Sequence, residues 1–165
     1  MFTIRKCQPD DVKAVRDLVT SVLNEEFPQE AQAYPTSDLE DILTSYGKLG
    51  EAFFVAAEKG KVVGTVGVKR EDERVALLRR LFVSPDFRRK KVGVQLLERA
   101  IEFCREVGYD EVIIKTTSTM NRAVELCEKK GFIPRARLNL GSLELLKLAL
   151  FLKDKSFFSK GETAA

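Results

Sequence analysis

The segment from residue 75 to residue 117 constrains the fold of this chain more than any other. An apolar stretch at 75–84 is followed by Pro85, and a helical pattern of apolar residues then continues to Gly108. A second apolar stretch, EVIIKTT, occupies 111–117. Two strands that are joined through a helix run parallel as a rule, with a right-handed crossover. The segment therefore predicts an α/β fold whose sheet contains a parallel pair of strands.

The first fifty residues predict one strand and two helices. Residues 2–7 have the pattern of a short strand, and residues 10–24 keep the apolar period of a helix. Ser37 and Glu40 have the spacing of a capping box, so we expect a second helix to begin there and to end at Gly47.

Strands dominate the chain from residue 52 onward. The expected elements outside the parallel unit are a hairpin at 52–58 and 62–70, a helix at about 121–130, and strands at about 134–139 and 145–153. No repeat, low-complexity tract or linker divides the sequence. We therefore expect a single domain at 1–153 and a flexible tail at 154–165.

The composition excludes several kinds of chemistry. The 165 residues include no histidine, which excludes Ser-His and Cys-His nucleophiles and any zinc or haem held by histidine. The formal charge of +3, from 28 basic and 25 acidic residues, is too small to suggest a dedicated nucleic-acid binder. Cys7, Cys104 and Cys127 form no CxxC pair and are odd in number, as expected for reduced thiols. No stretch has the length of a membrane span or of a signal peptide. We expect a cytoplasmic protein that binds no metal, nucleic acid or membrane.

Four cations stand at the predicted start of the helix in the parallel unit. The run Arg88, Arg89, Lys90 and Lys91 lies where the helix dipole favours negative charge, and Gly93 follows in the first helical turn. A strand, a basic turn and a helix N-terminus with a glycine can cradle an anion, above all a phosphate. The alternative is a solvated basic turn without a ligand.

Two segments resemble the signatures of a known family, the GNAT superfamily of N-acyltransferases. The segment LRRLFVSPDFRRKKVGVQLL at 78–97 is similar to its acyl-coenzyme A motif, Arg/Gln-x-x-Gly-x-Gly/Ala, with Arg88 in the first position and Gly93 in the last. Lys91 stands in place of the first glycine. The segment AVELCEKKGF at 123–132 is similar to the second signature, A-x-x-L-Y-E-K-x-G-F.

The resemblance implies a fold and a coenzyme site. The implied fold is a mixed sheet of about six to seven strands, with a central splayed parallel pair and about four flanking helices. The backbone of Leu81, Phe82 and Val83 would bind the pantetheine arm of acetyl-CoA. Asn121 lies one position after the place where relatives often carry an asparagine, so it either contacts the coenzyme or caps its own helix. The implied pyrophosphate cradle comprises Arg88, Arg89, Lys90, Lys91, Val92, Gly93 and Val94.

The proton-transfer residues are where this chain departs from the family. Cys127 stands where relatives often carry a tyrosine that serves as general acid, and its alternative role is packing in the core. Relatives often have a glutamate on the strand before the cradle, but residues 75–77 are apolar here. Glu25, Glu26 and Glu73 remain as candidate bases, each with the alternative of a solvated surface charge.

The resemblance implies an N-acetyltransferase that moves an acetyl group from acetyl-CoA to a primary amine on a small molecule, peptide or protein N-terminus. Transfer would occur by direct attack in a ternary complex. Acidic residues at 25–30 are expected to line the acceptor cleft and to attract a cationic amine. The alternative is a non-catalytic module of the same fold that binds or senses coenzyme A. The sequence leaves open whether the protein is a monomer or a homodimer.

Overall fold

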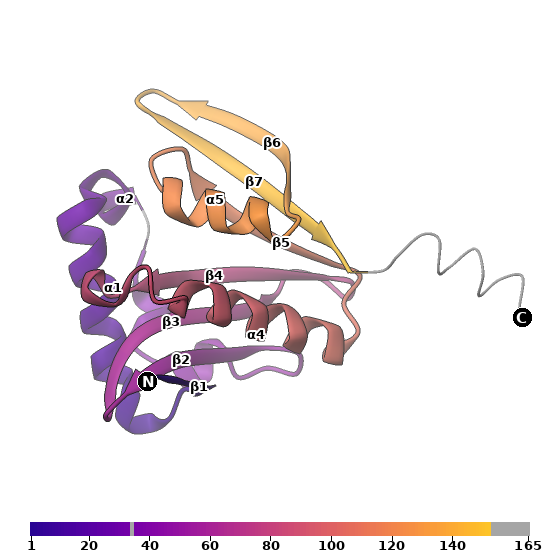
Figure 1. Ribbon diagram of the computed structural model, residues 1–165. Helices are drawn as coiled ribbons and strands as arrows, with labels where there is room; N and C mark the ends of the chain where they lie inside the picture. Colours follow the sequence, from indigo (N-terminus) through magenta and orange to yellow (C-terminus); the bar gives the residue numbers. More distant parts are fainter. Residues whose placement is uncertain (34, 153–165) are drawn as a thin grey trace, which may run out of the picture.

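Seven strands form one sheet in the order β1-β2-β3-β4-β5-β7-β6 (Figure 1). The computed structural model describes residues 1–33 and 35–152. Every neighbouring pair in the sheet is antiparallel except β4 and β5, which run parallel, as the unit at 75–117 predicts. The strands are β1 (Thr3–Lys6), β2 (Ala52–Glu58), β3 (Lys61–Arg70), β4 (Val75–Val83), β5 (Glu111–Thr117), β6 (Ile133–Leu140) and β7 (Leu143–Phe151).

Helices cover both faces of the sheet. Phe54 of β2 points into the cluster formed with α4, whereas its neighbours Phe53 and Val55 point into the cluster formed with α1. Because successive side chains of a strand alternate between faces, α1 and α4 lie on opposite sides of the sheet. The helices are α1 (Val12–Glu26), α2 (Pro28–Ala33), α3 (Ile42–Ser45), α4 (Val92–Val107) and α5 (Asn121–Lys129), with 3₁₀ turns η1 (Pro9–Asp11), η2 (Ser37–Leu39) and η3 (Pro85–Phe87).

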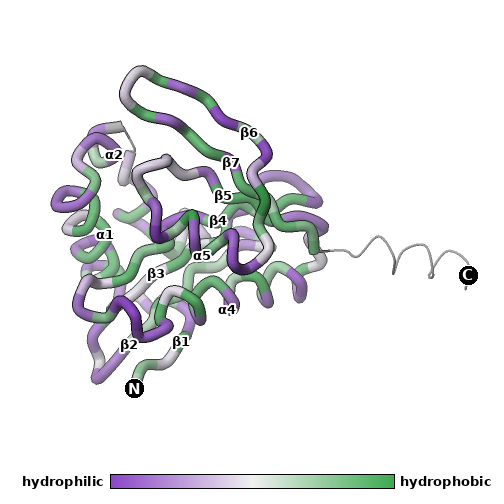
Figure 2. Tube along the Cα trace, turned by 45° about the horizontal axis from the view of Figure 1, so that its top comes forward, coloured by the Kyte–Doolittle hydropathy of each residue, from purple (hydrophilic) through white to green (hydrophobic). Residues whose placement is uncertain are grey.

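Helix α4 packs its apolar stripe directly on β3 and β4. Figure 2 shows hydrophobic residues concentrated along the strands and on one side of the helices. A Cβ atom at Gly64 of β3 would come within 2.7 Å of the Leu96 side chain and 2.9 Å of Val92, so this approach requires glycine. The buried residues of the stripe are Val92, Leu96, Leu97, Ala100, Ile101 and Cys104, as the sequence pattern predicts.

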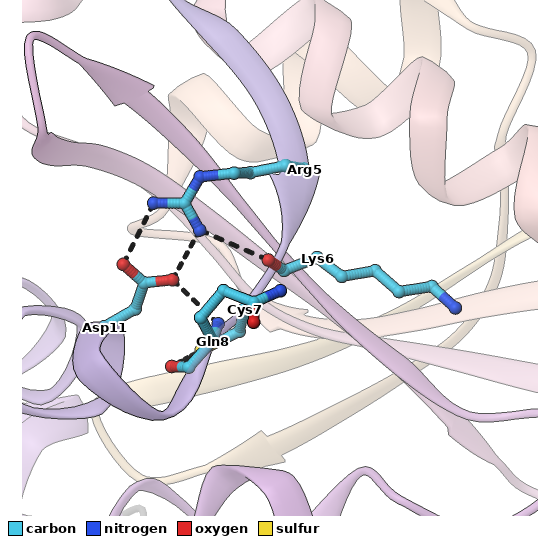
Figure 3. A network of polar contacts seen from close by, with 5 residues as sticks. All are labelled: Arg5, Lys6, Cys7, Gln8 and Asp11. Carbon is cyan, nitrogen blue, oxygen red and sulfur yellow. Dashed lines mark hydrogen bonds and ion pairs between the residues drawn. The ribbon is translucent and has the colours of Figure 1, made fainter.

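The N-terminal strand and the first helix are joined by an ion pair (Figure 3). The guanidinium of Arg5 donates to both carboxylate oxygens of Asp11, with an Nη2–Oδ1 distance of 3.0 Å. The Gln8 backbone N–H donates to the same carboxylate at 2.7 Å. The hydrogen bond from Arg5 holds the pKa of Asp11 below its ordinary value. These bonds fix the turn that places α1 on the sheet.

The segment between α1 and β2 differs from the expectation. The prediction of one helix from Ser37 to Gly47 is wrong, because the chain forms η2 and the four-residue α3 instead. Ser37 and Glu40 form no capping box; the side chain of Asp41 caps α3 by accepting from Thr44 N at 3.4 Å. The physical reason is tertiary, since the carboxylate of Asp38 lies against a buried arginine of β4.

Three further sequence expectations concern the C-terminal tail, the cysteines and membrane-spanning helices. The predicted tail at 154–165 lies outside the described residues. All three cysteines are free thiols and are buried. Within the described residues, no helix is long and apolar enough to cross a membrane.

Candidate active site

The parallel strands β4 and β5 separate halfway along their length. They pair at only four positions, from Val75 with Glu111 to Leu78 with Ile114, although both strands continue beyond. A bulge in β4 accompanies the separation, since Gly67 pairs with Arg79 while Thr65 pairs with Phe82. The extra residue is Arg80, which has a left-handed φ of 58°. The bulge and the end of the ladder leave a gap in the middle of the sheet.

A cavity of about 290 Å³ lies in this gap. Leu23 of α1 lines it from one face of the sheet, and Ala123 of α5 lines it from the other. The cavity therefore passes through the sheet between β4 and β5. Its remaining lining residues are Leu77, Leu78, Arg79, Arg80, Leu81, Phe82, Ile114, Lys115, Thr116 and Met120.

The end of β4 presents backbone groups to the gap. Ser84 N–H donates to the Val63 carbonyl of β3 at 2.8 Å, which fixes the side to which this residue's backbone points. Because backbone groups alternate along a strand, those of Phe82 also face β3, whereas those of Leu81 and Val83 face the gap. Leu81 and Val83 can therefore pair with an extended amide-bearing chain in the gap. Phe82 contributes its side chain to the cavity wall.

The turn after β4 forms the start of α4. Lys91, at the place of the motif's first glycine, is the N-cap and has a left-handed φ of 66°. This is the conformation that glycine adopts most easily, so the loop keeps the backbone path of a glycine despite the lysine. The N–H groups of Val92, Gly93 and Val94 belong to the first helical turn and have no acceptor within the helix. Together with the exposed cations of Arg89 to Lys91, they fit an anionic pyrophosphate.

Arg88 forms an ion pair with Glu26 and is not a free cation of this turn. Its guanidinium donates to both oxygens of Glu26 at 2.9 and 2.7 Å, and Arg122 donates to the same carboxylate at 3.2 Å. The hydrogen bond from Arg88 lowers the pKa of Glu26 below its ordinary value. The ion pair joins the end of α1 to the turn before α4. A carboxylate held in this way is a weaker base.

The other predicted catalytic residues lie apart from the cavity lining. Glu73 is exposed in the turn between β3 and β4. Cys127 is fully buried in the core cluster with α4, and burial raises its pKa to about 12. Asn121 is the exposed first residue of α5, where Met120 is the N-cap. The alternative that Asn121 caps its own helix is therefore wrong.

Two buried polar pairings near the site were not foreseen from the sequence, although Glu30 belongs to the acidic segment at 25–30. Glu30 of α2 is 2% exposed, and its Oε1 accepts hydrogen bonds from Thr117 at 3.1 Å and Thr119 at 2.6 Å. Arg80 donates to both oxygens of Asp38. Each pair joins residues at least 42 positions apart, and no local pattern indicates either pairing.

The geometry agrees with what the chain resembles among known proteins. Residues 16–132 match the model of the Acetyltransferase (GNAT) family, so the chain belongs to that family. It is similar to "Probable N-acetyltransferase camello" of Xenopus tropicalis, with 36% identity over 115 residues, 67% of this chain and 52% of that protein. It is also similar to N-acetylaspartate synthetase of Danio rerio, with 39% identity over 98 residues, 58% of this chain and 35% of that protein. The chain thus spans about half of the first relative's length and about a third of the second's.

The same fold occurs in solved structures. A Salmonella typhimurium protein, yncA, solved with its cofactor acetyl-CoA, superposes with a TM-score of 0.79. The alignment covers 93% of this chain and 95% of that one, at 20% identity. The fold implied by the sequence motifs, a mixed sheet of six to seven strands around a splayed parallel pair, is confirmed.

Proposed function

We propose that the protein is an N-acetyltransferase that moves an acetyl group from acetyl-CoA to a primary amine by direct attack. The observation that carries the proposal is the gap between β4 and β5, which passes through the sheet beside the strand whose end leads into the turn before α4. Family membership supports the activity, and the named activities of the relatives are of the same class. The gap suits an extended pantetheine arm, and the cradle suits its pyrophosphate.

The reaction exchanges one bond for another without oxidation or reduction. The neutral amine nitrogen attacks the thioester carbonyl carbon, a C–N bond forms, and the C–S bond breaks. The thiolate of coenzyme A leaves with the electron pair, and the proton lost by the nitrogen balances its charge. The products are an acetamide and coenzyme A, so the chain needs no nucleophile of its own. This is consistent with a sequence that has no histidine.

The chain's residues bind and orient the two substrates. Leu81 and Val83 offer backbone N–H and C=O groups to the gap, and an N–H aimed at the thioester oxygen stabilises the charge that develops there. The ion pair of Arg88 with Glu26 holds the cradle against α1. Much of the rate would come from holding the amine near the thioester carbon.

The proposed reaction does not need Cys127 as a general acid or Glu26 as a general base. Thiols have a reference pKa of about 8.5, so the thiolate is a tolerable leaving group near neutral pH. A Cys127 thiol with a pKa of about 12 holds its proton more tightly than the leaving group does, which favours the packing interpretation of Cys127. The lowered pKa of Glu26 favours the interpretation of that residue as structural. An α-amine, with a reference pKa of about 7.7–8.0, would need less help from a base than a lysine amine.

The second candidate function is a non-catalytic module that binds coenzyme A. The apolar residues at 75–77 and Cys127 favour it, because they occupy places where relatives often carry proton-transfer groups. Two measurements separate the candidates. Acetyl-CoA at millimolar concentration should raise the melting temperature under both. Release of free thiol in the presence of an amine panel is expected only for the enzyme. A chain that is not stabilised by acetyl-CoA would refute both.

A matched pair of variants tests the position of the cradle. A Cβ atom at Gly93 would lie 3.2 Å from the Leu126 side chain and 3.5 Å from Val83, so alanine fits with a shift of a few tenths of an ångström. Gly93→Ala should therefore keep the thermal shift caused by acetyl-CoA. Gly93→Glu places a carboxylate in the proposed pyrophosphate site and should abolish that shift. If acetyl-CoA raises the melting temperature of Gly93→Glu as much as that of Gly93→Ala, the coenzyme binds elsewhere.

A further inference from the structure

Three cations lie on β4, β5 and β7 near the cavity. Arg79 and Lys115 belong to the cavity lining, and Lys147 of β7 is the direct register partner of Lys115. Side chains directly opposite on antiparallel strands have Cβ atoms about 5 Å apart on the same face, and like charges there are unfavourable. The pairing of two lysines beside an arginine therefore opposes stability, and an anion at this place would relieve it.

These cations face α1, on the side of the sheet away from α4 and α5. Leu78 and Ile114 point into the cluster formed with α4, so the next residue of each strand, Arg79 or Lys115, points to the opposite face. Lys147 shares the face of Lys115 because the two are register partners. The proposed cradle lies at the N-terminus of α4, so the cations stand at the other mouth of the cavity, where the acceptor would enter.

Little negative charge offsets these cations. The neighbouring Arg80 is paired with Asp38, whose charge also acts on Arg79 at longer range, and Lys115 has one half-exposed partner, Glu71, at 3.2 Å. Neither Arg79 nor Lys147 has an ion-pair partner among the described residues.

Two of the three acidic residues that were expected to attract a cationic acceptor are engaged elsewhere. Glu26 binds two arginines, and Glu30 is buried against two threonine hydroxyls. The third, Glu25, is exposed near the end of α1. Cations therefore predominate at the α1 mouth.

Given the proposed acetyl transfer, on which this rests, we infer that the acceptor is an amine that also carries a carboxylate, such as a free amino acid. Its carboxylate binds Arg79 and Lys115, with Lys147 adding to the positive field, and its amino group points into the gap. The planar guanidinium of Arg79 can donate two parallel hydrogen bonds to a carboxylate, and Lys115 supplies a second charge. Arg79 and Lys115 are then the residues that determine acceptor specificity.

Matched acceptors test the inference directly. L-Leucine and L-leucinamide differ by one charge at the same position, as do L-glutamate and its α-amide. The amide also has a less basic amine, so kcat/KM is compared per neutral amine, which isolates the α-carboxylate. We expect kcat/KM for the acid to exceed that for the amide by about tenfold or more, the ratio for one charge-assisted contact. An amide that is acetylated as well as its acid would overturn the inference while leaving the acetyltransferase activity in place.

Charge-removing variants locate the effect. Arg79→Gln and Lys115→Gln should each raise KM for the acid about tenfold and leave KM for the amide and for acetyl-CoA unchanged. Lys61→Gln, an exposed lysine at the start of β3, is the matched control and should change neither. A rise in KM for acetyl-CoA instead would assign these cations to the coenzyme and refute the inference.

A binding measurement keeps the inference separate from the proposed activity. Isothermal titration of N-acetyl-L-leucine and N-acetyl-L-leucinamide, with coenzyme A present, requires no turnover. Tighter binding of the acid, lost in Arg79→Gln, supports the carboxylate site even in a protein that acetylates nothing. Equal binding of the two compounds by the wild-type protein would overturn it.

Discussion

Replacing Asp38 with asparagine should destabilise the protein strongly. The Arg80 side chain is 6% exposed and that of Asp38 is 11% exposed, so both charges lie almost wholly out of water. Asp38 accepts from Arg80 at 2.7 and 3.1 Å and from the Tyr46 hydroxyl at 2.6 Å. Burial by itself would raise the pKa of Asp38, but the hydrogen bonds from Arg80 and Tyr46 outweigh it and keep the pKa below its ordinary value. The carboxylate therefore remains charged beside the guanidinium at neutral pH.

The expected loss of stability in Asp38→Asn arises from the Arg80 charge that stays buried. Removing one partner of a buried ion pair costs about 3–5 kcal/mol, because the other charge stays buried without compensation. Asparagine keeps one oxygen, and Arg80 keeps its bond to the Pro35 carbonyl at 2.7 Å, so we expect a loss near 3 kcal/mol, at the lower end of that range. With a urea m-value of about 2 kcal/mol/M, the unfolding midpoint should fall by about 1.5 M.

Urea unfolding followed by far-ultraviolet circular dichroism suits this chain, which has no tryptophan. Asp17→Asn is the control, because Asp17 pairs with Lys13 on the exposed face of α1 and should leave the midpoint unchanged. The double variant Asp38→Leu with Arg80→Met removes both charges and should recover part of the loss. The reasoning fails if Asp38→Asn unfolds at the same urea concentration as the wild type.

Three further predictions concern pH, Cys127 and Glu26. The pKa values of Asp11 and Asp38 are lower in the folded protein than in the unfolded chain. Their contribution to the free energy of unfolding is therefore complete above the unfolded pKa of about 3.9, and it is lost as the pH falls through the folded values. The urea midpoint should therefore fall as the pH drops below about 4, and less so in Asp38→Asn. Cys127→Ala should keep turnover, measured by thiol release, within about twofold of the wild type. Urea unfolding should show a loss of about 1 kcal/mol in unfolding free energy, because the substitution leaves a small cavity. A large fall in kcat would instead support Cys127 as the general acid. Glu26→Gln should raise KM for acetyl-CoA several-fold, because Arg88 loses its strongest partner, whereas a fall in kcat of about a hundredfold would identify Glu26 as the base.

The sequence predicted those parts of the molecule that depend on neighbouring residues. The parallel unit at 75–117 was predictable because its apolar periods and its stops at Pro85 and Gly108 are local signals. The turn before α4 was predictable because four cations at a helix start oppose the dipole. The helix expected from Ser37 to Gly47 failed because a tertiary contact, Asp38 with Arg80, decides the local conformation.

The proposed coenzyme part of the site follows one contiguous motif, so the sequence allows its residues to be named together, and their role remains a prediction. The proposed acceptor part depends on contacts between distant segments. The left-handed conformation of Arg80 was not predictable, since arginine gives no sign of a positive φ. The positive mouth of the cavity depends on the register of Lys115 with Lys147, and register between strands is set by the folded sheet.

The short ladder between β4 and β5 limits the hydrogen bonds that link the two halves of the sheet. Four residue pairs join a half-sheet of β1 to β4 to a half-sheet of β5, β7 and β6. Beyond Leu78 the two halves lack the hydrogen bonds that continuous strands would share. An extended amide-bearing arm in the gap would supply bonds of this kind and act as a partial strand between them. Binding of such an arm should then slow amide hydrogen exchange in β5 and β7 as well as in β4, because the arm would link the two half-sheets.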